Sequence, residues 1–342
     1  MNLKELSLKL GLSQTTVSRA LNGYPEVNEA TRMRVAEVAR QFNYSPNKRA
    51  TGLATGKAMT IGHVIPTSSQ HEMVNPVFGD FVAGASEAYS EYGYDMLFSQ
   101  VGDGAQEGAY IELKRKGAID GLVLQGPLAN DQRIGILNKV GLPFVVHGRA
   151  TQIDEVYSWV DVNNASSFQR ATEFLLDLGH TRIALINGIE EMDFAQRRRV
   201  GYVDALNARG IKPDPALMKS AEMTEVYGHH EMRDMLTMDN PPTAILSSSL
   251  ITAIGVRRAI EEAGLKMGRD ISVITHDDDL SYLRNGQDVP IFTATRSSVR
   301  EAGRIIARML IDQIQNPGGS AKSLLLEAEL VVGRSTGPAP RK

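Results

Sequence analysis

From residue 58 onward, short apolar runs alternate with longer amphipathic stretches, and this alternation limits the possible folds more than any other feature. Helical stretches are expected at 78–92, 165–178, 195–209 and 252–263. Frequent alternation of strand and helix predicts an α/β protein with parallel sheets that are covered by helices. The runs with the length and composition of strands are 60–66, 94–100, 120–126, 143–149, 157–162, 182–188, 243–249, 270–277 and 324–332.

The segment after residue 58 is too long for one comfortable sheet, since about ten strands are the usual upper limit of an open sheet. We therefore predict two α/β lobes within residues 59–342. The first lobe is expected to hold 59–160 and 292–322, and the second 161–291 and 323–336. A ligand site is expected where the carboxyl ends of the strands face each other.

Polar residues recur at the ends of the predicted strands: His147 with Arg149, then 247–249, then 276–279. One such residue means little, because every strand must leave the core, but the recurrence favours a polar ligand site. The run His276 to Asp279 also raises the possibility of a metal site. Consecutive residues on a strand point to opposite faces, which is poor geometry for chelation, so we expect no metal and no cofactor.

The first 46 residues predict a small helical domain with a helix-turn-helix. Leu3, Leu6 and Leu10 have helical spacing after a possible cap at Asn2. A second helix runs from Gln14, capped by Ser13, to about Leu21, and a third from Asn28 to Phe42. Two short helices joined by a tight turn containing glycine, followed by a third, are typical of a helix-turn-helix domain.

The second helix needs only Val17, Ala20 and Leu21 for packing. Gln14, Thr15, Ser18 and Arg19 are then left on the outer face, mostly near the amino-terminal end. A recognition helix presents its first turns to base edges in the major groove, and Gln and Arg can bond adenine and guanine through two hydrogen bonds each. The alternative is a small helical bundle with an ordinary polar surface.

Charge favours the DNA interpretation. Residues 1–57 carry nine Lys and Arg against four acids, a net charge of +5, while the whole chain is −3, so the remainder carries −8. A basic head on an acidic body indicates a polyanionic partner. There is no cysteine, no apolar run long enough for a membrane span and no secretory signal, so we expect a cytoplasmic protein.

The linker 47–58 is basic and rich in Gly and Thr. Its GLATGKA resembles a phosphate-binding loop but has three residues between the glycines instead of four, and Ala58 follows the lysine. No nucleophile elbow, zinc-protease motif or complete dinucleotide turn occurs, which argues against an enzyme. Leu53 stands alone among small residues and could be an apolar wedge for a DNA base step.

Head and body together resemble the lactose/galactose repressor (LacI/GalR) family of bacterial transcription regulators. The resemblance rests on LSQTTVSRALNG, VNEATRMRV, NYSPN, NPVFGDFVAG, VDVNNAS, LGHTRIALING, RRRVGY, EEAGLKMGRDISVITHDD and LEAELVVGRST, in the family's order along nearly the whole chain. It implies a body with the type I periplasmic-binding-protein fold, which binds a small effector between its lobes and forms a homodimer on palindromic double-stranded DNA.

The resemblance also implies roles for single residues. Base-reading positions are Gln14, Thr15 and Arg19, and Ala50 and Leu53 belong to a hinge that enters the minor groove. DNA-backbone contacts are implied for Ser13, Thr16, Ser18, Asn22, Thr31, Tyr44 and Asn47. Effector contacts are implied for Phe78, Arg198 and Asp277.

Two positions depart from the family pattern: Ser249 and Gly148 stand where many members have Asn and Asp. We keep Ser249 as an effector residue and expect His147 or Arg149 to replace the missing carboxylate contact. The sequence thus predicts a repressor of sugar catabolism or transport genes, controlled by a sugar such as an α-glucoside. The alternative is a periplasmic-type sugar-binding protein of a transporter, which shares the body fold but needs no basic head.

Overall fold

The computed structural model describes residues 1–44, 56–67, 72–102, 104–276 and 279–341. The chain divides into two compact units, residues 1–59 with 117–119, and residues 60–116 with 120–342. The head and the body are therefore described separately. Four residues with predicted roles, Asn47, Ala50, Leu53 and Asp277, lie outside the described residues.

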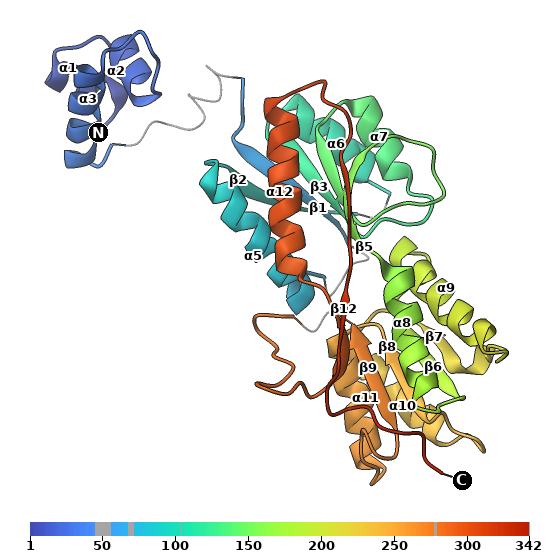
Figure 1. Ribbon diagram of the computed structural model, residues 1–342. Helices are drawn as coiled ribbons and strands as arrows, with labels where there is room; N and C mark the ends of the chain where they lie inside the picture. Colours follow the sequence, from blue (N-terminus) through green and yellow to red (C-terminus); the bar gives the residue numbers. More distant parts are fainter. Residues whose placement is uncertain (45–55, 68–71, 103, 277–278, 342) are drawn as a thin grey trace. The chain divides into compact units, whose positions relative to one another are not determined.

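The head contains the three predicted helices, α1 (Leu3–Leu10), α2 (Gln14–Leu21) and α3 (Glu29–Gln41) (Figure 1). Their amino-terminal caps are the predicted side chains: Asn2 accepts from the Glu5 amide, Ser13 from Thr16 and Asn28 from Thr31. The small core joins Leu6, Leu10, Val17, Ala20, Val27, Val35 and Ala39, all buried.

Phe42, which would continue the apolar stripe of Val35 and Ala39 if the helix ran on, is instead 41% exposed. It follows the last residue of α3, where the backbone leaves the helix, so its side chain no longer points along the stripe. The Lys9 ammonium lies 3.9 Å from the centre of its ring, a cation–π contact that covers one face of the ring.

The first lobe of the body is a sheet of six parallel strands, in the order β11-β5-β4-β3-β1-β2. Helices α5 and α12 pack together against it, as Figure 1 shows. Its elements are β1 (Thr60–Pro66), a short 3-10 turn η1 (Glu72–Val74), α5 (Pro76–Glu91), β2 (Asp95–Val101), α6 (Gln106–Arg115), β3 (Gly121–Gln125), α7 (Gln132–Val140), β4 (Phe144–His147), β5 (Ser158–Val162), α12 (Val299–Gln315) and β11 (Ser323–Leu326).

The second lobe has the strand order β12-β10-β9-β8-β6-β7, with only β12 antiparallel to its neighbour. Helices α8 and α9 pair with each other, as do α10 and α11. Its elements are α8 (Asn164–Asp177), β6 (Ile183–Asn187), α9 (Asp193–Ala208), a 3-10 turn η2 (Pro215–Leu217), β7 (Met218–Ser220), α10 (Glu225–Leu236), β8 (Ala244–Ser247), α11 (Leu250–Glu262), β9 (Ser272–His276), β10 (Thr293–Arg296) and β12 (Glu329–Val331).

Both lobes share the order second-first-third-fourth-fifth along the sheet, a doubly wound arrangement. The strand order reverses between β1 and β3 in one lobe and between β6 and β8 in the other. Ligands of such sheets bind beyond the carboxyl ends of the strands at this reversal. The fold class predicted from the strand–helix alternation is therefore confirmed, and it points to Gln125, Asn187 and Ser247 as the ends to inspect.

Close approach of paired helices depends on glycine. A Cβ built on Gly84 of α5 would overlap the Arg300 carbonyl oxygen of α12, and one on Gly201 of α9 would overlap the Ala165 carbonyl oxygen of α8. A Cβ on Gly255 of α11 would likewise overlap the Glu225 carbonyl oxygen of α10. Any larger residue at these places would push the two helices apart.

The lobe boundaries differ from the predicted ones by several residues. The chain passes between the two sheets after β5, after β10 and after β11, that is, beyond residues 162, 296 and 326. The predicted strand 324–332 is wrong as one strand: Ser323–Leu326 pairs parallel with β5, whereas Glu329–Val331 pairs antiparallel with β10. A continuous apolar run gives no sign of where the chain changes sheets.

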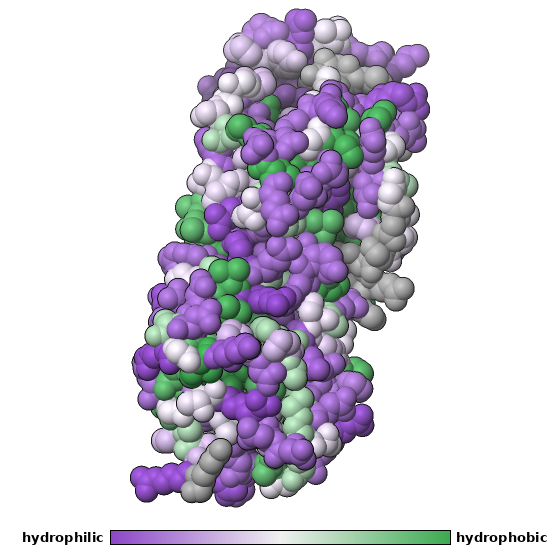
Figure 2. Space-filling model, turned by 90° about the vertical axis from the view of Figure 1, so that its right-hand side faces the viewer, coloured by the Kyte–Doolittle hydropathy of each residue, from purple (hydrophilic) through white to green (hydrophobic). Residues whose placement is uncertain are grey.

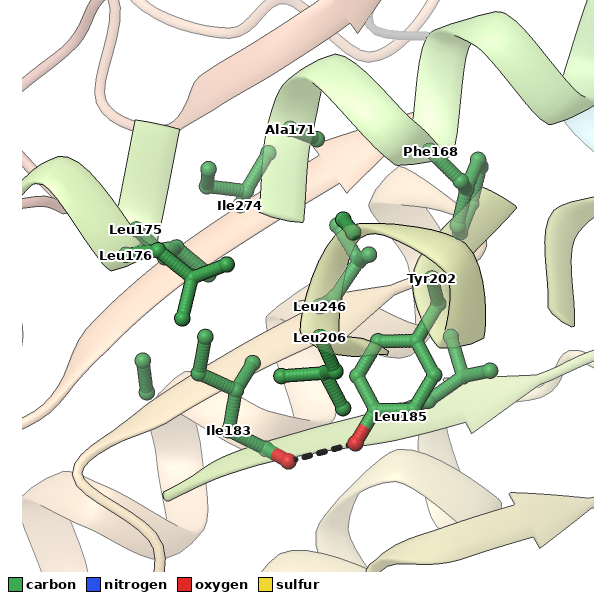
Figure 3. Packing of buried hydrophobic residues seen from close by; sticks show 12 residues of the cluster. Phe168, Ala171, Leu175, Leu176, Ile183, Leu185, Tyr202, Leu206, Leu246 and Ile274 are labelled. Atoms are coloured by element: carbon green, nitrogen blue, oxygen red, sulfur yellow. Dashed lines mark hydrogen bonds between the residues drawn. The ribbon is translucent and has the colours of Figure 1, made fainter. Parts of the chain in front are cut away.

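The core of the second lobe is apolar with few exceptions. Phe168, Leu185, Leu206 and Leu246 are fully or almost fully buried together, as Figure 3 shows. Tyr202 is also buried, and its hydroxyl donates a 2.7 Å hydrogen bond to the Ile183 carbonyl oxygen. The bond satisfies a polar group that would otherwise destabilise the core.

On the face drawn in Figure 2, hydrophobic residues form separate small patches among hydrophilic ones.

The first lobe buries a histidine. His63 on β1 is 1% exposed and lies among Phe81, Tyr89 and Phe98, with ring centroids 5.2 to 6.5 Å away. Its Nε2 is 3.4 Å from the Tyr89 hydroxyl, and its Nδ1 has no hydrogen-bond partner among the described residues. Burial among aromatic rings lowers the pKa of His63 to about 4.

This burial predicts acid sensitivity. The pKa of His63 is lower in the folded protein than in the unfolded chain, so between pH 6.5 and 4 the unfolded chain binds more protons. The stability from neutral His63 is complete above pH 6.5 and falls by about 3 kcal/mol on going to pH 4. Urea unfolding of the parent and of His63→Phe across this range should give curves that diverge by that amount. Parallel pH profiles would contradict the assignment.

Candidate functional sites in the head and body

Helix α2 presents a polar outer face because its apolar residues all point inward. Val17 and Ala20 are buried in the head core. Gln14, Thr15 and Arg19 are exposed, so the three predicted base-reading side chains are accessible together on one short helix. The Arg19 guanidinium is 3.5 Å from the Glu26 carboxylate, and both are about half exposed, so solvent screens this pair and it is easily exchanged for another anion.

Most of the predicted backbone-contact residues that the structure describes lie at or near the ends of α2 and α3. Ser13 Oγ and Thr16 Oγ1 are 2.8 Å apart at the start of α2. At its end, Asn22 Nδ2 donates to the Ser18 carbonyl oxygen over 2.8 Å. Thr31 donates its amide to the side chain that caps α3, and the Tyr44 amide donates to Ala39 after that helix ends. Backbone amides and short hydroxyls at helix ends are suited to phosphate oxygens.

In the body, the two lobes contact each other through segments that follow the carboxyl ends of strands. Leu128, after β3, forms an antiparallel bridge with Met192, after β6. Ser281, after β9, donates its amide to Asp80 of α5 over 2.6 Å. The strand ends of the two sheets therefore lie on the sides of the lobes that meet.

The Arg198 side chain is held by contacts on several sides. It lies on α9 and is 5% exposed. Its Nε donates to Asn164 Oδ1 over 2.7 Å and its Nη1 to the Ser248 carbonyl oxygen over 2.8 Å. The guanidinium carbon also lies 4.7 Å from the Phe194 ring and 5.1 Å from the Phe168 ring. A forked donor held this rigidly is suited to recognising neighbouring oxygen atoms of a ligand.

Asn187 and Ser248, which the sequence reasoning did not single out as contacts, build the surroundings of Arg198. The Asn187 side chain is fully buried, accepts from the Ser248 hydroxyl over 2.8 Å and donates to the Ala195 carbonyl oxygen on α9. Both stand at ends of predicted strands, which is the signal that could have identified them. Ser249 is predicted as an effector residue, and here its hydroxyl caps α11 by accepting from the Thr252 amide.

The first lobe contributes aromatic rings and one buried amide. His147, at the end of β4, stacks on Phe81 with centroids 4.6 Å apart, and its Nδ1 is 2.8 Å from Gln125 Oε1. Gln125 Nε2 is buried and has no hydrogen-bond partner among the described residues. Phe78 is 8% exposed and packs edge-on to Phe98. Predicted effector residues Phe78 and His147 therefore belong to one aromatic group at the strand ends.

Arg149 is engaged differently from the prediction. Its Nε donates to Asp161 Oδ2 over 2.8 Å, and its guanidinium carbon lies 4.9 Å from the Trp159 ring. The prediction that Arg149 contacts the effector stays a prediction. Such a contact would require the Arg149 guanidinium to bind the effector and Asp161 at the same time.

The residues that the structure describes hold no group of three His, Asp or Glu side chains arranged for a metal ion. His229, the first residue of the sequence HHE at 229–231, has its Nε2 2.7 Å from the Glu262 carboxylate in the second lobe. Nor is any described helix both long enough and apolar enough to cross a membrane.

Known proteins match both parts of the chain. Residues 2–47 match the family described as bacterial regulatory proteins, lacI family, and residues 172–336 match a periplasmic binding protein-like domain. The HTH-type transcriptional regulator AglR of Rhizobium meliloti (strain 1021) is 46% identical over 341 residues, covering 99% of this chain and 95% of that protein. The chain belongs to the LacI family.

Further relatives agree. The HTH-type transcriptional regulator RafR of Escherichia coli is 34% identical and covers 95% of this chain and 94% of that protein. Among solved structures, a transcriptional regulator CelR–cellobiose complex superimposes with a TM-score of 0.72 at 27% identity, covering 98% of this chain and 99% of that one. The predicted family is confirmed: the chain is a DNA-binding transcriptional regulator and not an enzyme. The alternative of a transport protein does not fit the matched head.

Proposed function

We propose that this regulator represses genes of sugar catabolism or transport in the cytoplasm and responds to a sugar, such as an α-glucoside. The base-reading face of α2 would dock in the major groove of a palindromic operator, and the effector would bind at the strand ends of the two lobes. The rigid presentation of Arg198 beside other polar groups is the observation that carries the effector part of the proposal.

The structure of the head supports operator recognition through α2. Its first turn exposes Gln14 and Thr15, and Arg19 follows about one turn later. These side chains do not contribute to the head core, so they are free to be selected for contacts with bases. Each good bidentate contact with a base contributes about 1–3 kcal/mol of discrimination.

Replacing Gln14 with alanine should therefore weaken binding to an operator selected by the parent protein from random DNA, by about 5- to 150-fold. The melting temperature of the protein should stay unchanged, because Gln14 is exposed. Gln41→Ala, an exposed glutamine on α3, is the matched control and should bind like the parent. Equal affinity of both variants, measured by fluorescence anisotropy at fixed salt, would contradict base reading by Gln14.

The effector proposal is supported by chemistry on both lobes. Arg198 donates from the second lobe, and the buried Gln125 amide is available to donate from the first. The aromatic group of Phe78, Phe81 and His147 lies at the strand ends of the first lobe. A sugar offers acceptor and donor hydroxyls together with apolar faces of C–H groups, which such a mixture of side chains recognises.

We expect one sugar of a mono- and disaccharide panel to raise the melting temperature of the full-length protein by mass action. Arg198→Ala should lose this shift but still bind operator. Arg199→Ala removes the adjacent arginine, which pairs with Glu190 on the surface, and should keep the shift.

Both variants must first show a cooperative melting transition of their own. A retained shift in Arg198→Ala would show that Arg198 does not contact the sugar. If no sugar in the panel stabilises the parent, the sugar class itself is wrong.

We further propose that two copies associate through the α11 side of the second lobe. A groove of about 360 Å³ lies there between α11 and the segment 283–292. Beside it Ile254 is 38% exposed and Tyr282 85% exposed, with Arg258 and Glu261 on the same face. Apolar groups flanked by both charge signs suit a two-fold, self-complementary interface.

Ile254→Asp should therefore convert the dimer to a monomer in sedimentation velocity and weaken binding to a two-half-site operator far more than to a single half-site. Val156→Asp changes a 78% exposed valine in the first lobe and should leave the protein dimeric. A dimeric Ile254→Asp protein would place the interface elsewhere.

A further inference from the structure

A network of charged side chains connects the two lobes beside the proposed effector site. Asp161 on β5 accepts from Arg149 of its own lobe over 2.8 Å and from Arg197 Nη1 of the second lobe over 2.7 Å. Arg197 Nε is also 2.5 Å from Asp193, one turn earlier on α9. Asp193 in turn accepts the Thr151 amide of the first lobe over 3.0 Å and contacts the Thr151 hydroxyl.

These groups are buried, so their pairing has a large effect. The carboxylates of Asp161 and Asp193 are at most 4% exposed, and the Arg197 side chain is 13% exposed. A buried charge that loses its only partner is strongly destabilising. The backbone supports the same junction, since the Asp193 amide donates to the Pro127 carbonyl oxygen over 3.1 Å.

Each of these buried charged side chains nevertheless keeps a partner in its own lobe when the lobes separate. Asp161 retains Arg149 within the first lobe, and Arg197 retains Asp193 within α9. Within this group, the contacts that cross between the lobes are the Arg197–Asp161 ion pair, the Thr151–Asp193 hydrogen bonds, the Asp193 amide bond to Pro127 and a 3.5 Å hydrogen bond from Arg197 Nη1 to the Val162 carbonyl oxygen. Separation therefore strands no buried charge, which makes the junction reversible.

Arg197 also precedes Arg198, the residue assigned to the effector. Consecutive helical residues point about 100° apart, so one arginine of α9 reaches Asp161 while the next reaches Asn164 and Ser248. A shift of α9 that changes one set of contacts must change the other.

We propose that Arg197 and Asp161 are positioning residues that latch the two lobes in the arrangement that binds the effector. This rests on the proposed effector site and goes beyond it, because neither residue is assigned to touch the ligand. The latch sets how often the two lobes are correctly placed, and hence the effector concentration that the regulator needs.

The chain has no cysteine, so a labelled pair can be introduced directly. Lys139 on α7 and Asn207 on α9 are exposed and belong to different lobes. Nitroxides on Lys139→Cys and Asn207→Cys report the distance between the lobes by pulsed electron resonance, without any effector. The label pair is combined with Arg197→Gln, Asp161→Asn or Arg133→Gln. The last variant is the matched control, because Arg133 and Asp131 form a buried pair, 2.6 Å apart, within the first lobe alone.

We expect Arg197→Gln and Asp161→Asn to add a second, different distance, and Arg133→Gln to reproduce the parent distribution. With the sugar that stabilises the parent, half-maximal stabilisation of the two latch variants should need about 10-fold more sugar, and the control should be unchanged. Identical distributions in all four proteins would overturn the latch. A changed distribution in a protein that no sugar stabilises would uphold the latch and reject the proposed effector.

Discussion

The meeting of strand carboxyl ends from two parallel sheets is the constraint on which the rest of the body depends. Parallel strands joined by helices place all their carboxyl ends at one edge, and in each lobe the order reverses there. The three passages between lobes leave from the ends of β5, β10 and β11, so the two edges stay together. Gln125 and His147 are thereby within hydrogen-bonding distance in the first lobe, as are Arg198 and Ser248 in the second, although each pair is distant in sequence.

In the head, different residues of one helix form the core and the exposed polar face. A few apolar residues of α2, chiefly Val17 and Ala20, pack into a core of seven buried side chains. Capping bonds from Ser13 and Asn28 fix where the helices begin. Gln14, Thr15 and Arg19 are exposed and lie outside this core, so the proposed base contacts would cost the head none of its packing. In the head a packed helical core presents polar side chains on α2, and in the body two packed sheets present them at the ends of strands.

Sequence reasoning predicted what depends on local pattern and missed what depends on tertiary pairing. Strand β1 has the predicted bounds, and the caps of the head follow from side chains beside the helices they cap. The split between β11 and β12 was not predictable, because an apolar run carries no mark of which sheet it joins. The shared ion-pair partner of Arg149 and Arg197 was likewise not predictable from the sequence. Asp161 is distant in the chain from Arg197, and an ion pair leaves no periodic pattern in the sequence.

Control of the head by an effector site in the body is tested most directly by thermodynamic linkage. For the sugar that stabilises the protein, its dissociation constant is measured by calorimetry with and without saturating operator, and the operator constant with and without saturating sugar. Coupled sites must change each other's affinity by the same factor, and we expect a factor of about 5 to 150. Unchanged constants in both titrations would contradict the account.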